Sequence, residues 1–143
     1  MPGIAAFAAA ARIAFAEQVR RVRHAESVRR SFLEALGAEL PAEAFRLNGH
    51  PDLRLPHIAN ISFPGCSAES LLMNLDLEGV AASGGSACTS GSLSPSHVLS
   101  AMGLPREIVK SAVRFSFGLG NTSEEAEKTA KITATIWARL RIN

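Results

Sequence analysis

Hydrophobic residues recur every three or four positions in the first third of the chain. Between residues 5 and 36 neither proline nor glycine interrupts the pattern. Its main members are Phe15, Val19, Val22, Ala25, Val28, Phe32 and Leu36. This spacing puts them on one side of a helix, and Gly37 follows where glycine commonly ends one. The pattern predicts one long amphipathic helix over about residues 5–36.

Two later segments alternate between hydrophobic and polar residues, as does a strand with one buried face. They are IANISF, residues 58–63, and SAVRFSF, residues 111–117. In the second, Val113, Phe115 and Phe117 fall on one side of the strand and Arg114 on the other. Shorter strands are expected around residues 45–47 and in GVAA, residues 79–82.

Capping residues mark the beginnings of further helices. The expected helices run from Ser67 to Leu75, from Ser94-Pro95 to Gly103, from near Pro105, and from Thr122 to about Leu140. In the second of them, Val98, Leu99 and Met102 form the expected core face. Helices interleaved with few strands predict an α/β (α+β) fold of two layers, with helices packed on one face of a small sheet. We expect one domain over residues 1–143: the long helix, then an α/β unit over about residues 41–143.

Composition narrows the class of protein. A chain of 143 residues with 47% hydrophobic residues has the make-up of a soluble globular domain. The net charge of +2 is small, and glutamates are interspersed among the arginines of residues 20–30 without aromatic residues, so a solvated helix face is favoured over a nucleic-acid surface. No apolar run is long enough for a membrane span. The opening segment lacks the basic region of a signal peptide, and two cysteines need not pair in a domain of this size, so a reduced, cytoplasmic setting is expected.

One cysteine, Cys88, lies in the stretch SGGSACTSGSLSPS, residues 83–96. Glycine and small polar residues make this stretch a candidate for a mobile loop over residues 83–95. A reactive cysteine needs solvent access and a means of stabilising its thiolate, and no histidine base is adjacent. The residues alone therefore leave two readings open, an inert loop cysteine and a nucleophile on a mobile arm.

Two other residues are candidates for chemistry. Cys66 follows Pro-Gly at a helix start, where a packing role is favoured because cysteine is often buried. Arg114 is unusual in a hydrophobic strand, and its guanidinium suits a planar carboxylate. A structural salt bridge with Asp76 or Glu78 is the alternative. No metal site is expected.

The sequence matches known motifs in order and spacing. These are PGIAAFAAA, LNGH, LPHIANISFPG, ESLLMNLDLEGVAASGGSAC, SGGSACTSGSLSPSHVL and SAVRFSFG. Together they resemble the C-terminal small domain of the cysteine desulfurases, pyridoxal-phosphate enzymes of the class V aminotransferase group that supply sulfur for iron–sulfur clusters. The cysteine stretch is similar to the catalytic loop of the subgroup with the longer loop, and the resemblance covers nearly the whole chain.

The resemblance implies a role for each matching residue. Cys88 would take sulfur from L-cysteine and become a persulfide, and Arg114 would hold the substrate carboxylate. The catalytic loop would include Ser83, Gly84, Gly85, Ser86, Ala87, Thr89 and Ser90. Gly84 stands where the family usually has serine, and Leu119 where many members have a basic residue.

The resemblance also implies what this chain lacks. Pyridoxal phosphate is held by a lysine in these enzymes. The lysines here, Lys110, Lys128 and Lys131, lie outside any matching motif. We therefore expect no cofactor bound to this chain alone, and a cofactor-bearing large domain or chain as its partner. A sulfur acceptor or scaffold protein and a homo-oligomer are further expectations.

Two alternatives to a split or partial desulfurase stay open at this point. One is a stand-alone persulfide carrier or partner-binding module that uses Cys88 without a cofactor. The other is an inactive truncated remnant, whose exposed surface would favour aggregation or dimerisation.

Overall fold

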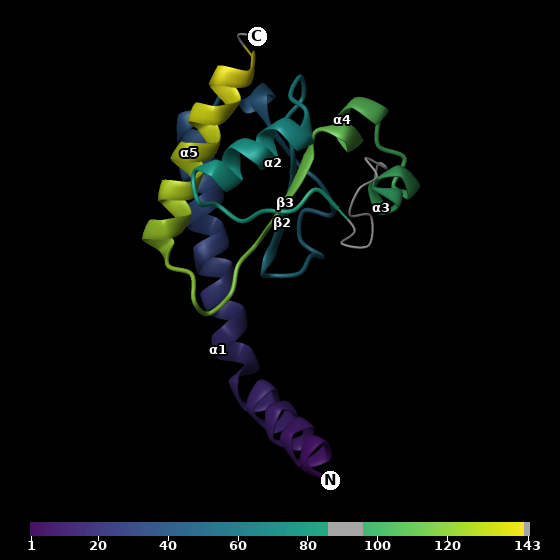
Figure 1. The fold of residues 1–143 in the computed structure, drawn as a ribbon, viewed down its shortest axis with the longest axis vertical. Coiled ribbons are helices and arrows are strands. Elements are labelled where there is room, and N and C mark those ends of the chain that lie inside the picture. The colour runs from purple at the N-terminus through teal and green to yellow at the C-terminus, as the bar shows by residue number, and fades with distance from the viewer. Residues whose placement is uncertain (86–95, 142–143) are drawn as a thin grey trace.

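The computed structural model describes residues 1–85 and 96–141. Its elements in chain order are α1 (Pro2–Glu39), a 3-10 turn (Ala42–Ala44), β1 (Arg46–Leu47), β2 (Ile58–Ser62), α2 (Ala68–Leu77), α3 (His97–Ala101), α4 (Arg106–Lys110), β3 (Ala112–Ser116) and α5 (Ser123–Arg141). Figure 1 shows the sheet between two groups of helices, with α1, α2 and α5 together and α3 and α4 at the opposite side. The predicted α+β class is confirmed; α1, α2 and α5 form the expected helical layer, and the short α3 and α4 lie on the other side of the sheet.

Within the described residues the sheet has three antiparallel strands in the order β1-β2-β3. The register pairs Ile61 with Val113 and Ala59 with Phe115. Directly paired residues share a face of a sheet. We call the side of these four residues the apolar face, and the side of Asn60, Ser62, Arg114 and Ser116 the polar face.

The core lies between the apolar face and the long helices. Phe32 of α1 is fully buried, and its ring centroid lies 4.7 Å from that of Phe115. Leu71 from α2 and Ile136 from α5 complete the same cluster. The alternation predicted for the two strands is therefore confirmed where it matters, because it gives the helices a continuous hydrophobic surface to cover.

The long helix extends further than its sequence pattern predicts at both ends. It begins at Pro2 and continues through Gly37 to Glu39, so the expectation that Gly37 ends it was wrong. Leu40 follows the last residue; its backbone N–H donates to Leu36 O at 3.0 Å and its side chain is buried. Burial of Leu40 favours another helical turn, which outweighs the weak preference of glycine for a helix end.

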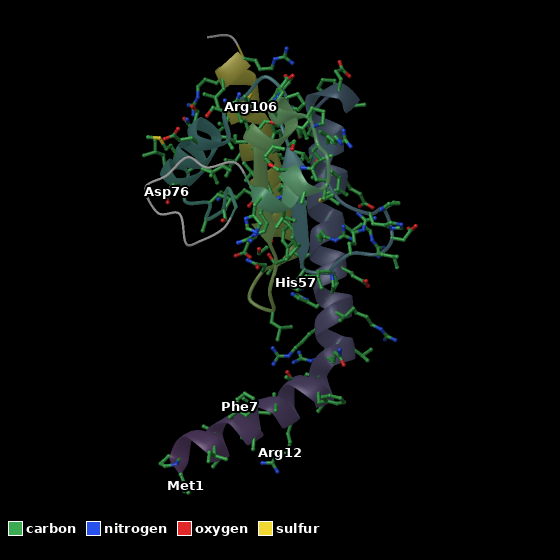
Figure 2. All side chains as sticks on the ribbon, turned by 90° about the vertical axis from the view of Figure 1, so that its right-hand side faces the viewer. Met1, Phe7, Arg12, His57, Asp76 and Arg106 are labelled. Carbon is green, nitrogen blue, oxygen red and sulfur yellow. The ribbon has the colours of Figure 1, made fainter. Side chains whose placement is uncertain are left out.

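The N-terminal part of α1 extends away from the rest of the structure (Figure 1). Phe7 and Phe15 have 77% and 85% of their surface exposed, and Val19 is exposed as well. Figure 2 shows Phe7 and Arg12 on this projecting part, well away from the sheet. Burial against the core begins only at Ala25. The predicted helix is thus confirmed, and Phe15 and Val19, which share its apolar spacing, lie on the part that no described residue buries.

Two other local expectations also differ from the structure. GVAA, residues 79–82, is not a strand; only Ser83 forms a bridge, to Arg114. In α3, Leu99 is buried but Val98 and Met102 are exposed, because a helix this short offers one residue to its small cluster with Val109 and Ala112. Ser96 caps this helix, and the expected start at Ser94-Pro95 falls outside the described residues.

Other predicted caps are confirmed. Ser67 accepts a hydrogen bond from Ser70 N at the start of α2. Before α5, Thr122 and Glu125 form a reciprocal capping box with bonds of 2.9 and 3.1 Å. Throughout residues 1–85 and 96–141, no helix is long and apolar enough to cross a membrane.

Candidate substrate-carboxylate site

Four polar residues form a row across the polar face. Asn60 of β2 pairs with Arg114 of β3, and Arg114 pairs on its other side with Ser83. Asn48 follows β1, and its backbone N–H donates to Asn60 O at 2.8 Å, which places it opposite Asn60. We call Asn48, Asn60, Arg114 and Ser83 the polar row. Residues from sequence positions 48 to 114 thus meet on one surface.

Arg114 is held through Ser83. The two residues exchange backbone hydrogen bonds of 3.1 and 2.6 Å, and Arg114 Nη2 donates to Ser83 Oγ at 3.5 Å. Arg114 Nε is buried and has no partner. Among the described residues no carboxylate forms an ion pair with Arg114, so the alternative of a structural salt bridge with Asp76 or Glu78 is not what is observed. The guanidinium keeps donors available for an acceptor from elsewhere.

Ser83 also ties Arg114 to the beginning of the cysteine stretch. Its hydroxyl donates to Gly85 O at 3.4 Å. A Cβ placed on Gly85 would lie 3.9 Å from the Cβ of Ser96, so the described residues on either side of the stretch are neighbours. Cys88, with Ser86, Ala87, Thr89 and Ser90, lies outside the described residues, and its predicted role stays a prediction. The cysteine stretch thus begins at Ser83, the partner of Arg114.

Gly84, the position where the family usually has serine, lies against α2. A Cβ there would be 3.0 Å from Leu72 Cδ1, closer than side chains normally approach. A serine at this position would require Leu72 to move. The glycine therefore has a local packing reason in this chain, apart from any effect on flexibility.

Cys66 is a packing residue, as predicted. It belongs to the main hydrophobic cluster and is 8% exposed. Burial raises the pKa of its thiol, and the Arg141 guanidinium opposes this more weakly. A protonated, buried thiol is a poor nucleophile, so Cys66 does not compete with Cys88 for a catalytic role.

Sequence reasoning did not single out Asn48 and Asn60. Asn48 Nδ2 donates to Asn60 Oδ1 at 2.8 Å and to Ser62 Oγ at 2.7 Å. A signal existed for Asn60, which occupies a polar position in an alternating strand, as Arg114 does. Nothing local shows that the two strands pair in the register that makes these residues neighbours.

The lysines of the chain do not fit a pyridoxal-phosphate site beside Arg114. Lys128 and Lys131 are exposed on α5, which packs on the apolar face of the sheet. Lys110 is the exposed last residue of α4. None of them belongs to the polar row. The described residues around Arg114 therefore do not include the Schiff-base lysine that the cofactor requires.

Comparison with known proteins identifies the family. The model of the aminotransferase class-V family matches residues 1–129, and the chain belongs to that family. IscS 1 of Bacillus subtilis strain 168 is 43% identical over 141 residues, which cover 98% of this chain and 37% of that protein. A cysteine desulfurase IscS of Methanosarcina thermophila is 40% identical over 141 residues, covering 99% and 34%.

A solved structure shares the fold. A NifS-like protein superimposes with a TM-score of 0.73 and 26% identity, over 90% of this chain and 31% of the other. The chain thus spans about a third of the length of the relatives it matches. The family uses pyridoxal phosphate.

Proposed function

We propose that this chain is the small domain of a cysteine desulfurase and acts together with a cofactor-bearing large domain. Cys88 accepts the sulfur atom of L-cysteine: the carbon–sulfur bond of the substrate breaks, a sulfur–sulfur bond forms on Cys88, and alanine is released. The persulfide then serves iron–sulfur cluster assembly or another sulfur-transfer pathway through an acceptor protein.

The observation that carries the proposal is Arg114. A guanidinium with a buried, unpaired Nε and no carboxylate partner in the described residues is costly to maintain for structure alone. It suits the carboxylate of an amino acid. The described residues beside the cysteine stretch are hydrogen-bonded to this arginine through Ser83, which supports a role for both in one reaction.

The projecting part of α1 supports the need for a partner. Ile4, Phe7 and Phe15 are largely exposed there, and Arg12 is the only charged residue among residues 2–16. An apolar helix of this kind is normally covered by protein. The relatives that align with α1 are about three times as long as this chain, so they have further residues able to cover it.

Reconstitution tests the proposal. The chain is mixed with L-cysteine, pyridoxal phosphate and the other two-thirds of a related desulfurase, produced separately; sulfide and alanine are then measured. We expect turnover in the mixture and none with either chain alone. Cys88→Ala should abolish it, while the matched Cys66→Ala should not. Equal activity of the Cys88→Ala mixture and the unmodified one would disprove the role of Cys88.

A stand-alone persulfide carrier is the second candidate. It requires that the chain alone be loaded with sulfur by a complete desulfurase, at Cys88 and not at Cys66, as read by intact mass. Loading without turnover in the reconstituted mixture would select the carrier. Absence of both, in a folded chain, would leave an inactive remnant.

A further inference from the structure

The hydrogen bonds of the polar face fix the orientation of the Asn60 amide. Ser62 is fully buried and its hydroxyl donates to Ile108 O at 2.7 Å, so toward Asn48 it can only accept. The Asn48 atom beside Ser62 Oγ is therefore the nitrogen of its NH₂ group. The same nitrogen lies 2.8 Å from the end of the Asn60 side chain. Asn60 consequently turns its oxygen toward Asn48. The hydrogen bonds around a side-chain amide decide which of its two ends carries the oxygen.

This orientation leaves the Asn60 NH₂ group as a donor. In the part of the chain that the structure describes, no acceptor contacts Asn60 Nδ2. Asn60 is half-buried, so its amide is neither lost in the core nor free in solvent. Its neighbour in the polar row, on the side away from Asn48, is Arg114.

The polar row therefore has one break. Asn48 donates to Asn60, and Arg114 donates to Ser83, while Asn48 Oδ1 and Arg114 Nε are buried without a partner. Between the two pairs, the Asn60 amide and the Arg114 guanidinium are both donors, with no acceptor between them among the described residues. Paired residues on adjacent strands have Cβ atoms about 5 Å apart. Two donor side chains that start from directly paired positions on one face suit a group with two acceptor oxygens.

We propose that Asn60 is a second donor for the substrate carboxylate, which it binds together with Arg114 and for which Asn48 sets its orientation. This inference rests on the proposed function for the identity of the substrate, L-cysteine. It assigns the two strands β2 and β3 to one binding site and gives Asn48 the role of a positioning residue. The carboxylate oxygens would accept from the Asn60 NH₂ and the Arg114 guanidinium, which have no shared acceptor among the described residues.

The decisive variant is Asn60→Asp, which keeps the shape of the side chain and replaces the donor by a negative charge. Ser116→Asp is the matched control, because it adds the same charge on the polar face two residues from Arg114. In the reconstituted mixture we expect Asn60→Asp to raise KM for L-cysteine about 10- to 100-fold with kcat nearly unchanged, as for loss of a hydrogen bond to a charged group. Asn60→Ala should give the lower end of this range and Ser116→Asp much less.

A readout on the chain alone separates this inference from the proposed function. The side-chain NMR signals of Asn60 Nδ2 and Arg114 Nε are followed during titration with L-alanine, and with ethylamine as the ligand without a carboxylate. We expect both signals to shift together with L-alanine only, and Asn48→Ala to weaken the shift of Asn60. Joint shifts in a chain that gives no turnover in the mixture would support Asn60 while the proposed function fails.

Two results would overturn the inference. One is an active mixture in which Asn60→Asp and Ser116→Asp have the same KM. The other is a titration in which the Asn60 signal stays unchanged, whether or not Arg114 responds. Either would assign Asn60 to a structural pair with Asn48 and nothing more.

Discussion

In β3, Val113 and Phe115 lie against the helices while Arg114, between them, faces the other way. On the apolar face every side chain named above is buried in the core. On the polar face Arg114 Nε and Asn48 Oδ1 are buried without a partner, and Ser116 is exposed. The two faces are made by alternate residues of the same strands, under the same backbone constraints.

The side chains of the two faces have opposite effects on the stability of the fold. Removing apolar surface from water stabilises the fold in proportion to area. A buried polar atom without a partner opposes folding by about 1–3 kcal/mol. The buried side chains of the apolar face are explained by stability. The buried Arg114 Nε and Asn48 Oδ1 are not, because neither has a partner among the described residues.

The largest effect on stability is expected on the apolar face. Phe32→Ala removes a fully buried ring that packs on Phe115 and Phe117. It should lower the free energy of unfolding by about 3–5 kcal/mol, measured by urea denaturation. Phe15→Ala, on the exposed part of the same helix, is the matched control and should change little. Similar losses for both would mean that the projecting part of α1 is packed in solution.

A smaller effect is expected where the polar face joins α4. Ser62→Ala removes the donor to Ile108 O and the acceptor of Asn48 Nδ2, and it leaves both groups without that partner. The expected loss is about 1–3 kcal/mol in the same measurement. Ser116→Ala, at an exposed position of the same face, should be nearly neutral. If Ser62→Ala were neutral too, the network would not be a rigid support for the row.

Replacing Arg114 should not lower the free energy of unfolding, unlike the replacements of Phe32 and Ser62. Arg114→Met keeps the length of the side chain and removes the unpaired Nε–H, so we expect unchanged stability or a gain of up to about 1 kcal/mol. Desulfurase turnover in the reconstituted mixture should be lost. Arg46→Met, exposed on the same face, should affect neither quantity. A clear loss of stability at Arg114 would contradict the absence of an ion-pair partner among the described residues.

The smallest effect concerns pH. Burial raises the pKa of Cys66 in the folded chain. The unfolded chain releases this proton from about pH 8.5, while the folded chain retains it to higher pH, so the folded state binds more protons and stability falls as pH rises through this range. Cys66→Ala should reduce the slope in urea denaturation above pH 8.5. An identical slope in both chains would show that the thiol ionises equally in the two states.

Much of the fold was accessible from sequence because its signals are local. Alternation defined β2 and β3, and the spacing of Thr122 and Glu125 defined the start of α5, since capping depends on atoms within one turn. Because successive side chains of a strand point to opposite faces, the same alternation placed Arg114 away from the core. Its role, and that of Cys88, came from resemblance and remains a prediction for this chain.

Other features followed from contacts between distant segments. Gly37 continues a helix because Leu40 reaches the core, and residues 79–82 stay irregular although they are apolar. Phe15 has the spacing of a core residue yet finds nothing to cover it. Local pattern reports what a residue favours, but burial depends on which segments meet it.

The sequence by itself determined the helices, the two alternating strands, the packing role of Cys66 and the family to which the motifs point. Only the tertiary structure decided that Asn48, Asn60, Arg114 and Ser83 lie in one row, and that Asn60 and Arg114 occupy paired positions with no acceptor bonded to the Asn60 NH₂ or to Arg114 Nε among the described residues. The physical reason is strand register: a shift of one residue would turn every side chain of a strand to the other face, and the contacts that fix the register join residues far apart in the chain.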